Sequence, residues 1–501
     1  MKITNDQVQS RFAKLAALKA RGLSAYAYAA RVTHRPAEIH AAAEALIAGG
    51  AIVHVAGRLL ALRGFGKATF GVIQDAGAKI QLYFKADTLG AETYALLPLL
   101  DLGDWIAASG PVMRTRTGEV TVQVHGCELL AKALLPPPAK WHGLKDHETR
   151  YRQRYADLIA NDEVRRIFLL RTRATSAVRR FLDERGFLEV ETPALQPLYG
   201  GAFARPFITH HNALGIPLYL RISDELYLKR LIVGGFDRVY EIGKDFRNEG
   251  IDKNHNPEFT MLELYQAYAD YHGMMDLTEK MLGTVRGELG LTGPGAWRGH
   301  AIDWTPPFPR VTYFGALSAA AGMDVTVAPL ADLAALAARH AVDVPANAPR
   351  AAYYDPLFGA LVEPGLIRPT FVLDYPREIS PLAKVKRDDE RVVERFELYV
   401  AGMELANAFS EQNDPVAQEE ALLVQEEKRR GGDEEAQALD LDYIRALMYG
   451  MPPTGGLGLG IDRLIMLLAG AESIRDVILF PLLRPEAADV ALDAEVEPAP
   501  G

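Results

Sequence analysis

The chain has 501 residues, about three times the ~150 residues typical of one domain, so we expect several domains. With 49% hydrophobic and 24% charged residues, its composition is that of a folded globular protein and excludes collagenous, low-complexity and membrane classes. A single cysteine, Cys127, excludes an internal disulfide and a zinc site built on several cysteines, so we expect carboxylates to hold any metal.

The formal net charge of -10 argues against a protein that coats nucleic acid indiscriminately, but the charge is unevenly distributed. Residues 1–133 contain fifteen Lys and Arg against ten Asp and Glu, which permits a local contact with nucleic acid or simply a solvated basic helix. The most apolar stretch, residues 459–471, is interrupted by Asp462 and Arg463, and the N-terminus has no apolar core of signal-peptide length. We therefore expect a cytoplasmic protein with no membrane partner.

Residues 1–50 predict an N-terminal helical extension. Apolar residues recur at helical spacing between residues 5 and 23, among basic residues, and Gly22 ends this helix. A second, alanine-rich helix is predicted over residues 36–48, before a pair of glycines.

The period then changes to that of β-strands, and residues 51–133 predict a small barrel. Glycine and polar turns separate about five short β-type runs, with one helix predicted at residues 91–97. The strand count and the interposed helix resemble the OB-fold, a barrel whose sheet face and loops bind single-stranded nucleic acid.

The segment Leu134-Leu-Pro-Pro-Pro138 cannot continue a helix or a central strand, so we place a linker at residues 134–150. A second domain is predicted over residues 151–485, beginning with a long helix from Asp162 to Glu184. Strand-like and helix-like segments then mix without regular βαβ alternation, which favours an α+β domain on a largely antiparallel sheet over a Rossmann fold. Residues 486–501 are acidic and predict a disordered tail.

Two glycine-rich segments differ from the common nucleotide-binding loops that they superficially resemble. Gly64-Phe-Gly-Lys67 has alanine after the lysine and lacks the first glycine of a P-loop. Gly456-Leu-Gly-Leu-Gly-Ile-Asp-Arg463 follows Met451-Pro-Pro-Thr454 rather than the buried strand that a dinucleotide-binding loop requires. A nucleotide must therefore be bound in another way.

Residues 239–265 predict a strand, a loop and a second strand whose faces carry unusual charge. On the first strand, alternation places Asp245, Arg247 and Glu249 on one face. On the second strand, it places Phe259, Met261, Glu263 and Tyr265 on one face. Such charges are costly on a buried face unless they are paired or bind a ligand. We interpret Phe259 as a surface for a planar base and Arg247 as a fork for phosphate or carboxylate, under a loop carrying His255 and Asn256. The alternative is an internal pairing of Arg247 with Glu249 or Glu263, with Phe259 in the core.

A second hairpin, residues 396–411, has the same character. Asn407, Phe409 and Glu411 project from one face, while Glu397 and Glu404 flank the turn as candidate oxygen ligands for a hard cation that carries phosphates. Strict alternation puts Glu404 on the face opposite Asn407, so a shared site needs a bulge or a strong twist near Leu405-Ala406. The alternative is a solvated hairpin whose carboxylates face water.

The glycine run leads into a helix at residues 461–468 with Arg463 in its first turn. Glycines permit close backbone approach to a ligand, and a cation at a helix start opposes the local dipole unless an anion lies there. We therefore interpret Arg463 as a phosphate ligand, or alternatively as a hydrated surface residue.

Three ordered segments resemble motifs one, two and three of the class II aminoacyl-tRNA synthetases. They are Gly186-Phe-Leu-Glu-Val-Glu-Thr-Pro193, Phe246-Arg-Asn-Glu249 with His255-Asn-Pro-Glu-Phe259, and Gly456 to Arg463. Within that class, residues 200–211, Glu225-Leu-Tyr-Leu-Lys229 and Asn407-Ala-Phe-Ser-Glu411 resemble the lysine-specific enzymes. The resemblance implies an OB-type anticodon-binding domain, an α+β catalytic domain with an antiparallel sheet, and a homodimer formed through motif one.

The resemblance also implies substrates and site residues. The enzyme would join L-lysine to tRNA(Lys) with ATP, through lysyl-adenylate, and Arg247 and Arg463 would offset charge as catalytic residues. The lysine site would contain Gly201 and Glu225 at the α-amino group, Arg247 and Asn407 at the carboxylate, and Tyr265 and Glu411 at the ε-ammonium, with Glu263 and Phe409 beside them. ATP would lie against Phe259 and Met261, near Arg247, Glu249, His255, Asn256, Glu404 and Arg463. Glu397 and Glu404 would bind Mg²⁺.

In the barrel, Arg63, Phe70 and Gln81 match positions associated with anticodon recognition. Phe70 would stack on an unpaired base while Gln81 bonds its edge, and the alternative for Phe70 is a place in the barrel core.

Three rival functions stay open at this point: a synthetase for aspartate or asparagine, a lysyltransferase acting on a protein, and a nucleic-acid-binding protein with an inert large domain. A cationic or amide residue in place of Glu411 would favour the first, and the barrel argues against the second.

Overall fold

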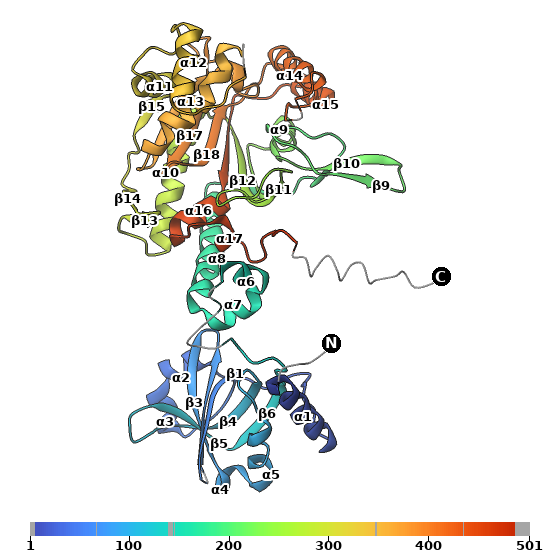
Figure 1. Ribbon diagram of the computed structural model, residues 1–501, viewed down its shortest axis with the longest axis vertical. Helices are drawn as coiled ribbons and strands as arrows, with labels where there is room; N and C mark the ends of the chain where they lie inside the picture. Colours follow the sequence, from blue (N-terminus) through green and yellow to red (C-terminus); the bar gives the residue numbers. More distant parts are fainter. Residues whose placement is uncertain are drawn as a thin grey trace. The chain divides into compact units, whose positions relative to one another are not determined.

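The computed structural model describes residues 6–66, 68–138, 144, 146–345, 348–433 and 435–485. The chain packs as two compact units, residues 1–162 and 163–501, which are described separately below (Figure 1). The predicted linker at 134–150 lies only partly within the described residues, and the predicted acidic tail lies outside them. The domain boundaries named above stay a prediction.

The first unit is built on a closed barrel. Its strands are β1 (Ile52–Phe65), β2 (Ala68–Asp75), β3 (Ala78–Lys85), β4 (Trp105–Arg114), β5 (Val120–Val124) and β6 (Gly126–Ala131). The strand order is β1-β2-β3-β5-β4-β6, and β1 also pairs with β4, which closes five strands into a barrel while β6 extends the sheet beyond β4. This arrangement confirms the predicted OB-type fold.

The sixth strand arises because the last predicted β-run changes partners within its length. β5 pairs with β3 and with the end of β4, whereas β6 pairs with the beginning of β4. The crossing occurs against Gly110 of β4, where an added Cβ would lie only 1.8 Å from the carbonyl oxygen of Gln123. A glycine is therefore required where the two segments of the run pass over β4.

Helices accompany the barrel strands: α1 (Asp6–Ala20), α2 (Pro36–Ala41), α3 (Ala43–Gly49), α4 (Ala86–Leu89), α5 (Ala91–Tyr94) and the 3₁₀ turn η1 (Leu97–Leu99). The unit also contains α6 (His147–Arg152) and α7 (Arg154–Ala160), which follow the barrel in the sequence. The single helices predicted at 36–48 and 91–97 are each divided, the first at Ala42 and the second by a non-helical segment before Leu97. Both segments follow the curved barrel surface, and Ile39 and Leu97 contribute to its core.

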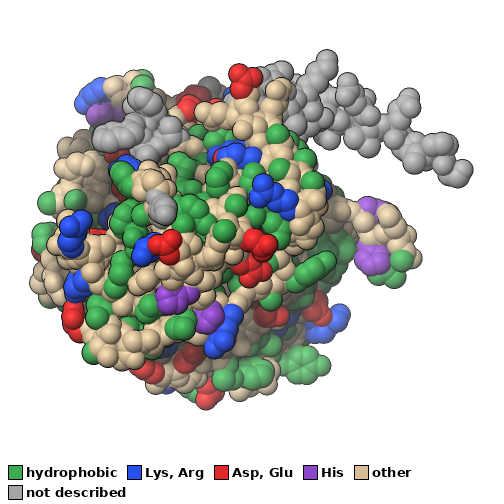
Figure 2. All heavy atoms as spheres, turned by 90° about the horizontal axis from the view of Figure 1, so that it is seen from below, with side chains coloured by type: hydrophobic (Ala, Val, Ile, Leu, Met, Phe, Trp, Pro, Cys, Tyr) green, Lys and Arg blue, Asp and Glu red, His purple; other side chains and the backbone are tan. Residues whose placement is uncertain are grey.

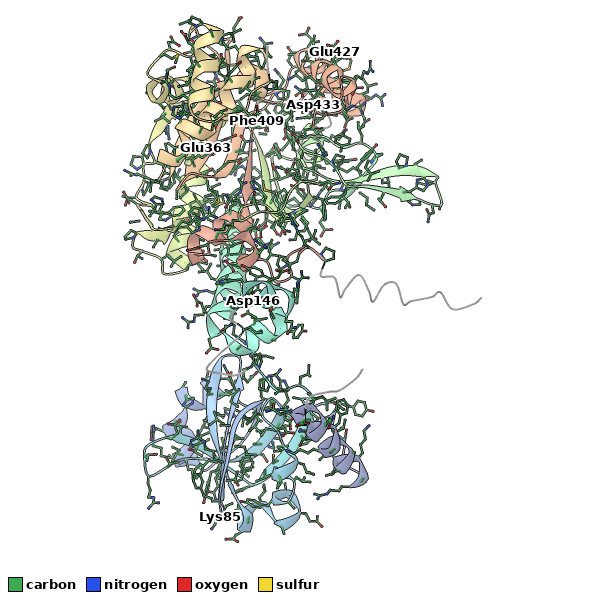
Figure 3. All side chains as sticks on the ribbon, viewed as in Figure 1. Lys85, Asp146, Glu363, Phe409, Glu427 and Asp433 are labelled. Carbon is green, nitrogen blue, oxygen red and sulfur yellow. The ribbon has the colours of Figure 1, made fainter. Side chains whose placement is uncertain are left out.

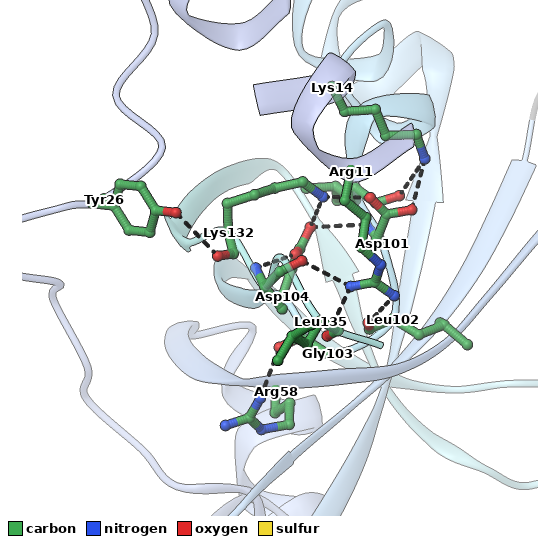
Figure 4. A network of polar contacts seen from close by, with 12 residues as sticks. Arg11, Lys14, Tyr26, Arg58, Asp101, Leu102, Gly103, Asp104, Lys132 and Leu135 are labelled. Atoms are coloured by element: carbon green, nitrogen blue, oxygen red, sulfur yellow. Dashed lines mark hydrogen bonds and ion pairs between the residues drawn. The ribbon is translucent and has the colours of Figure 1, made fainter. Parts of the chain in front are cut away.

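A buried polar network joins α1 to the barrel (Figure 4). Arg11, which is buried, donates to loop carbonyl groups, including that of Leu102 at 2.9 Å. The buried Lys132 ammonium lies 2.6 Å from an Asp101 oxygen and 2.8 Å from an Asp104 oxygen, and Lys14 of α1 pairs with the other Asp101 oxygen at 2.7 Å. Part of the basic side of α1 is therefore bound within the protein. On the face shown in Figure 2, Lys and Arg side chains are interspersed with Asp and Glu.

The second unit is built on one eight-stranded sheet. Its strands are β7 (Leu188–Glu189), β11 (Arg238–Phe246), β12 (Glu258–Ala267), β15 (Arg310–Thr312), β16 (Thr370–Pro376), β17 (Val392–Val400), β18 (Met403–Ser410) and β19 (Thr454–Gly460). The order is β15-β16-β17-β18-β19-β12-β11-β7, with parallel pairing only at the two edges. The predicted α+β domain with a largely antiparallel sheet is confirmed.

The helices of this unit are α8 (Asp162–Asp183), α9 (Glu225–Val233), α10 (Tyr271–Glu288), α11 (Tyr313–Ala321), α12 (Leu330–Arg339), α13 (Tyr354–Leu361), α14 (Pro415–Arg430), α15 (Leu441–Met448), α16 (Ile461–Ala469) and α17 (Ile474–Val477). The 3₁₀ turns are η2 (Arg350–Tyr353), η3 (Glu363–Gly365) and η4 (Arg377–Ile379). Two small sheets contain β8 (Leu195–Gln196), β9 (Ile208–His211) and β10 (Ile216–Leu220), and β13 (Gly295–Trp297) and β14 (His300–Ile302). The β9–β10 hairpin extends away from the large sheet (Figure 1).

The large sheet has one apolar face and one polar face. α8, α10 and α16 pack against the apolar face, to which the central strands contribute Leu262, Leu264, Phe396, Leu398, Ala406, Ala408, Leu457 and Leu459. On the other face, one apolar cluster forms around α9 and α15 at the β11–β12 side, and another around α11, α12 and α13 at the β16–β17 side. The middle of this face, formed by β12, β19, β18 and β17, therefore lies between two packed regions.

In the described residues, no helix is both long and apolar enough to cross a membrane.

Candidate active site

A cavity of about 340 Å³ opens over the middle of the polar sheet face, within the size range of small-molecule sites of roughly 300–1,000 Å³. All of the predicted lysine, ATP and metal residues of the second unit line it: Gly201, Glu225, Arg247, Glu249, His255, Asn256, Phe259, Met261, Glu263, Tyr265, Glu397, Glu404, Asn407, Phe409, Glu411 and Arg463. Residues from three separated parts of the sequence are thus brought together by the order of the central strands.

Three buried carboxylates, Glu225, Glu263 and Glu411, line this cavity. Burial raises the pKa of Glu411 to about 8 and raises the pKa of Glu225, and in both cases Lys229 acts in the opposite direction. Burial, reinforced by Glu225 and Asp245, also raises the pKa of Glu263 well above its usual value. Buried carboxylates that protein partners neutralise only in part are typical of a site for a cationic ligand.

The backbone around Glu225 brings it to the cavity. Glu225 is the first residue of α9, and its backbone N–H donates to Ser223 Oγ at 3.1 Å. Gly201 has a φ of +88°, and an added Cβ would lie 2.9 Å from Ser223 Oγ and 3.2 Å from Glu225 Cβ. Gly201 is therefore required both by its left-handed conformation and by the close approach of α9.

The glycine run at residues 456–460 belongs to the central strand β19, with α16 following directly. An added Cβ at Gly456 would lie 2.0 Å from Glu411 Oε1 and 2.5 Å from Tyr265 Cε1. An added Cβ at Gly458 would lie 2.7 Å from Glu263 Oε1. These glycines thus make room on a buried strand for the carboxylates of neighbouring strands, rather than for the direct approach of a ligand that was predicted from the sequence.

Arg247 and Glu249 lie beyond the end of β11, which stops at Phe246, so they are not members of a strand face as predicted. Both nevertheless line the cavity, because the Arg247 N–H donates to the carbonyl oxygen of Pro257 at 2.9 Å and keeps the loop paired. The Arg247 guanidinium lies 5.1 Å from the centre of the Phe259 ring. Among the described residues Arg247 forms no ion pair with Glu249 or Glu263, so the internal pairing considered above is wrong.

The loop between β11 and β12 carries a polar network that reaches Arg463. His255 Nδ1 lies 2.8 Å from Asp252 Oδ2, and His255 Nε2 lies 3.2 Å from Arg463 Nη2. Because an arginine can only donate, this network assigns Nε2 as the acceptor and Nδ1 as the protonated nitrogen. Asn256 is buried and donates from Nδ2 to the carbonyl oxygen of Glu258 at 2.6 Å.

The β17–β18 hairpin contains the bulge that the sequence analysis required. Glu397 pairs with Asn407 and Leu398 with Ala406, but Tyr399 pairs with Glu404, so Leu405 is the extra residue. This bulge turns Glu404 to the same face as Glu397 and Asn407, and all three line the cavity. The solvated-hairpin alternative is wrong for Glu397 and Glu411, which are buried.

Arg395 orders this part of the cavity. It donates to Asn407 Oδ1 at 2.9 Å and to Glu397 Oε1 at 2.5 Å, and its guanidinium lies 4.5 Å from the centre of the Tyr375 ring. Burial raises the pKa of Glu397 to about 7, against the opposing effect of Arg395. The engaged amide oxygen of Asn407 leaves its NH₂ group as the donor that it can offer to a ligand.

Arg463 lies in the first turn of α16 and is not a hydrated surface residue. Its Nη1 donates to the Glu404 carbonyl oxygen at 2.7 Å and to Glu404 Oε2 at 3.0 Å. Partial desolvation raises the pKa of Glu404, but Arg463, together with Arg395 and Arg247, lowers it, so the net direction is downward. The guanidinium therefore stays at the cavity wall, next to a helix N-terminus that favours anions.

In the barrel, strand register places Arg63, Phe70 and Gln81 on one outer face. Arg63 pairs directly with Phe70, and Phe70 with Tyr83, two residues along β3 from Gln81. Phe70 is half-buried and its ring centre lies 4.9 Å from that of Tyr83, so it belongs to a surface aromatic group and not to the barrel core. Gln81 Oε1 accepts from Thr121 Oγ1 at 2.8 Å.

The sequence profile of the tRNA synthetases class II (D, K and N) matches residues 146–484, and that of the OB-fold nucleic acid binding domain matches residues 53–130. The first match covers more than half of the chain. The chain belongs to the class II tRNA synthetases.

Sequence similarity to other proteins extends over nearly the whole length of this synthetase. It is 51% identical to the lysine–tRNA ligase of Moorella thermoacetica over 483 residues, which cover 96% of this chain and 98% of that protein. It is 52% identical to the lysine–tRNA ligase of Carboxydothermus hydrogenoformans, with the same coverage. The lysine–tRNA ligase of Roseiflexus castenholzii is 52% identical over 96% of this chain and 99% of that protein.

Several residues of this class II site carry no functional prediction from the sequence. Lys229 is fully buried, and its ammonium contacts Glu225 Oε1 and Glu411 Oε2. Its spacing of four residues from Glu225 on one helix was a usable signal, as was the Arg395–Glu397 alternation on a strand. Gln437 also lines the cavity, buried and with its amide oxygen unpaired among the described residues, and no sequence pattern marks it.

Proposed function

We propose that this synthetase is a lysine–tRNA ligase, which activates L-lysine with ATP and transfers the lysyl group to tRNA(Lys). The observation that carries the proposal is the placement of Glu225 and Glu411 in one cavity with the donor fork of Arg247. Because the family includes three specificities, D, K and N, the charge of the side-chain pocket decides between them. A buried carboxylate at residue 411 favours a cationic substrate and repels aspartate.

In this assignment the substrate lysine spans the cavity with both ammonium groups on carboxylates. Glu225, with Gly201, receives the α-amino group, and Glu411, with Tyr265, receives the ε-ammonium. Glu263 adds a carboxyl oxygen beside Tyr265, whose hydroxyl donates to Glu263 Oε2 at 3.2 Å. Phe409 of β18, labelled in Figure 3, supplies an apolar wall for the methylene chain.

The substrate carboxylate is assigned to Arg247 and to the NH₂ group of Asn407. ATP is assigned to the adjoining part of the cavity, with adenine on Phe259 near Met261 and with Glu249, His255, Asn256 and Arg463 around ribose and phosphates. The position of Arg463 on a helix N-terminus and the guanidinium of Arg247 over the Phe259 ring support this assignment.

Glu397 and Glu404 fit a magnesium site. The bulge at Leu405 places both on the cavity wall, and Glu404 raises the pKa of Glu397, as a like charge held close by does. Within the described residues no group of three or more His, Cys, Asp or Glu is placed to hold a metal. Mg²⁺ prefers one or two carboxylates, with phosphate and water oxygens as its remaining ligands. The ion would neutralise negative charge on the phosphates of ATP.

The chemistry requires no protein nucleophile. A lysine carboxylate oxygen attacks the α-phosphorus of ATP, the bond to the bridging oxygen breaks, and pyrophosphate leaves. A terminal tRNA hydroxyl then attacks the lysyl carbonyl carbon, and AMP leaves. Arg247 would hold the attacking carboxylate and Arg463 the phosphates, so that two anions approach each other in a fixed geometry.

We also propose that the outer barrel face of Arg63, Phe70 and Gln81 binds the anticodon. Half-buried Phe70 offers a stacking surface, and exposed Arg63 beside it offers a charge for the RNA backbone.

We further propose a cytoplasmic homodimer formed through motif one. Exposed apolar side chains of this region support the dimer: Leu169, Leu188, Leu195 and Ile208.

Amino-acid-dependent exchange between ATP and labelled pyrophosphate, measured with each of the twenty amino acids, tests the proposed activation step. We expect exchange with lysine and at least 100-fold less with aspartate or asparagine, because burial of an unpaired Glu411 costs several kcal/mol. Exchange with aspartate instead, or no exchange with any amino acid, would contradict the proposal. Attachment of labelled lysine to tRNA(Lys) then tests the transfer step.

A further inference from the structure

Lys229 lies behind the cavity wall, in the middle of α9. It is fully buried, and an isolated ammonium at such a position would be strongly unfavourable. Its Nζ contacts Glu225 Oε1, one helical turn earlier, and Glu411 Oε2, which follows β18. One ammonium thus joins two carboxylates that come from sequence positions almost two hundred residues apart.

Two aromatic rings complete the surroundings of this ammonium. Lys229 Nζ lies 5.2 Å from the ring centre of Phe409 and 5.9 Å from that of Tyr265. Glu225, Glu411, Phe409 and Tyr265 all line the cavity, whereas Lys229 is not among the described residues that line it. Lys229 therefore contacts the side chains of the amino-acid pocket from the protein side, without occupying the space of a ligand.

The contact uses one oxygen of Glu411 and leaves the other. Oε2 is the oxygen that forms the ion pair with Lys229, and neither Glu411 oxygen has a further hydrogen-bond partner among the described residues. Oε1 lies against cavity-lining Gly456, because a Cβ added there would be 2.0 Å from it. An unpaired oxygen that is held from behind and placed beside the cavity is arranged for a cationic ligand.

The charge state of Lys229 is consistent with this geometry. Burial acts to lower the pKa of Lys229, but Glu225 and Glu411 raise it above its usual value, so the side chain stays cationic. Without that charge, two buried carboxylates would be left to repel each other.

We propose that Lys229 is a positioning residue for amino-acid recognition: its ammonium ties Glu225 and Glu411 together, so that the two carboxylates that receive the substrate's ammonium groups keep a fixed spacing. The inference rests on the proposed function. Lysine and ornithine differ by one methylene between the two ammonium groups, so a fixed spacing contributes to their discrimination.

The variant Lys229→Met tests this role in the pyrophosphate exchange assay on the full-length enzyme. Breaking a buried ion pair exposes an uncompensated charge, so we expect the KM for lysine to rise on the order of 100-fold. The KM for ATP should change by less than about threefold, because no ATP-assigned residue contacts Lys229. The matched control is Arg230→Met, the neighbouring residue, which pairs with Asp440 at 2.8 Å away from the cavity lining and should leave both KM values unchanged.

A double-mutant cycle separates positioning from a general effect on folding. If Lys229 acts by holding Glu411, Glu411→Gln should raise the KM for lysine far less in the Lys229→Met background than in the wild type. Independent effects would multiply, and that result would overturn the proposal. Equal rises in the KM for lysine and for ATP, with a wild-type melting temperature, would also overturn it.

A conservative variant covers the case in which Lys229→Met does not fold. Lys229→Arg keeps the charge but changes the geometry at a fully buried position, so we expect a raised KM for lysine and weaker discrimination against ornithine. A wild-type KM and wild-type discrimination in this variant would overturn the positioning role. Failure of the proposed function is distinct, because the wild-type enzyme itself would then show no lysine-dependent exchange.

Discussion

Two buried lysines, one in each unit, bridge pairs of carboxylates and yet have different consequences. Lys132 joins Asp101 and Asp104 in the barrel, where the oxygens of Asp104 also accept from the backbone N–H groups of Asp101 and Ala133 at 2.8 Å. Lys229 joins Glu225 and Glu411, which face a cavity, and one Glu411 oxygen has no partner among the described residues. Buried charged groups thus connect parts of the structure where each of them has a protein partner. Where one of them has an oxygen without a partner, they form a binding site.

The pKa directions of the two regions express the same difference. Burial raises the pKa of Asp101, but Lys132 and Lys14 lower it by more, so the net direction is downward. At Glu411 burial prevails over Lys229, and the pKa is raised to about 8. The barrel network is therefore stable by itself, whereas the cavity gains most when a cation arrives.

The largest expected effect is that of Glu411→Gln, which removes the unmatched charge from the cavity. We expect the KM for lysine to rise on the order of 10³-fold and the KM for ATP to change little, because the ε-ammonium loses its ionic partner. Steady-state pyrophosphate exchange measures both. Glu420→Gln, an exposed residue of α14, is the control, and equal changes in the two KM values would remove Glu411 from the side-chain pocket.

Lys132→Met breaks the matched network of the barrel instead. We expect it to lower the free energy of unfolding by about 3 kcal/mol, because two carboxylates lose a buried partner, while the KM for lysine stays unchanged. Chemical denaturation measures the stability. The control is Lys85→Met, whose partly exposed pair with Asp87 at 3.6 Å should contribute less than about 1 kcal/mol (Figure 3). Similar losses in the two variants would show that burial does not separate them.

Phe70→Leu separates the functions of the two units. Loss of one base-stacking ring should raise the KM for tRNA(Lys) by about 10-fold, since stacking contributes on the order of 1–3 kcal/mol per base. Lysine-dependent pyrophosphate exchange, which needs no tRNA, should be unaffected. A change in exchange with an unchanged KM for tRNA(Lys) would contradict an anticodon role for this face.

The smallest expected effect is a pH dependence of lysine binding. At a pH below its pKa of about 8, Glu411 of the free enzyme is largely protonated. A bound ammonium favours the ionised form of Glu411. Lysine binding should therefore release up to about one proton at pH 7, and its affinity should rise by about fivefold from pH 7 to pH 8. Calorimetry in buffers of different ionisation enthalpy measures the proton release, which should disappear in Glu411→Gln.

The same raised pKa has a consequence for stability in the absence of lysine. A carboxyl with a folded pKa above its unfolded value stabilises the folded state below the unfolded pKa, and this contribution is lost as the pH rises through about 8. Saturating lysine should remove that loss, because it compensates the charge on Glu411.

Alternation along single strands was enough to predict much of the cavity. Met261, Glu263 and Tyr265 alternate with Leu262 and Leu264, and this pattern separates the cavity face from the core face without knowledge of any other strand. The bulge near Leu405 was also deducible, because Glu404 and Asn407 cannot otherwise share a face. Such inferences succeed because the two-residue period of a strand is set by local backbone geometry.

The sequence by itself determined the barrel, the antiparallel sheet and the residue types of the site, because propensity, alternation and motif order are local properties. It did not determine that Lys229 contacts Glu411, that Gly456 makes room for that carboxylate, or that Arg247 lies beyond its strand. Those features depend on the order in which β12, β19 and β18 lie side by side, and on which charges remain unmatched once they do. Only the tertiary structure decides this, since the cost of a buried charge depends on neighbours that are distant in the chain.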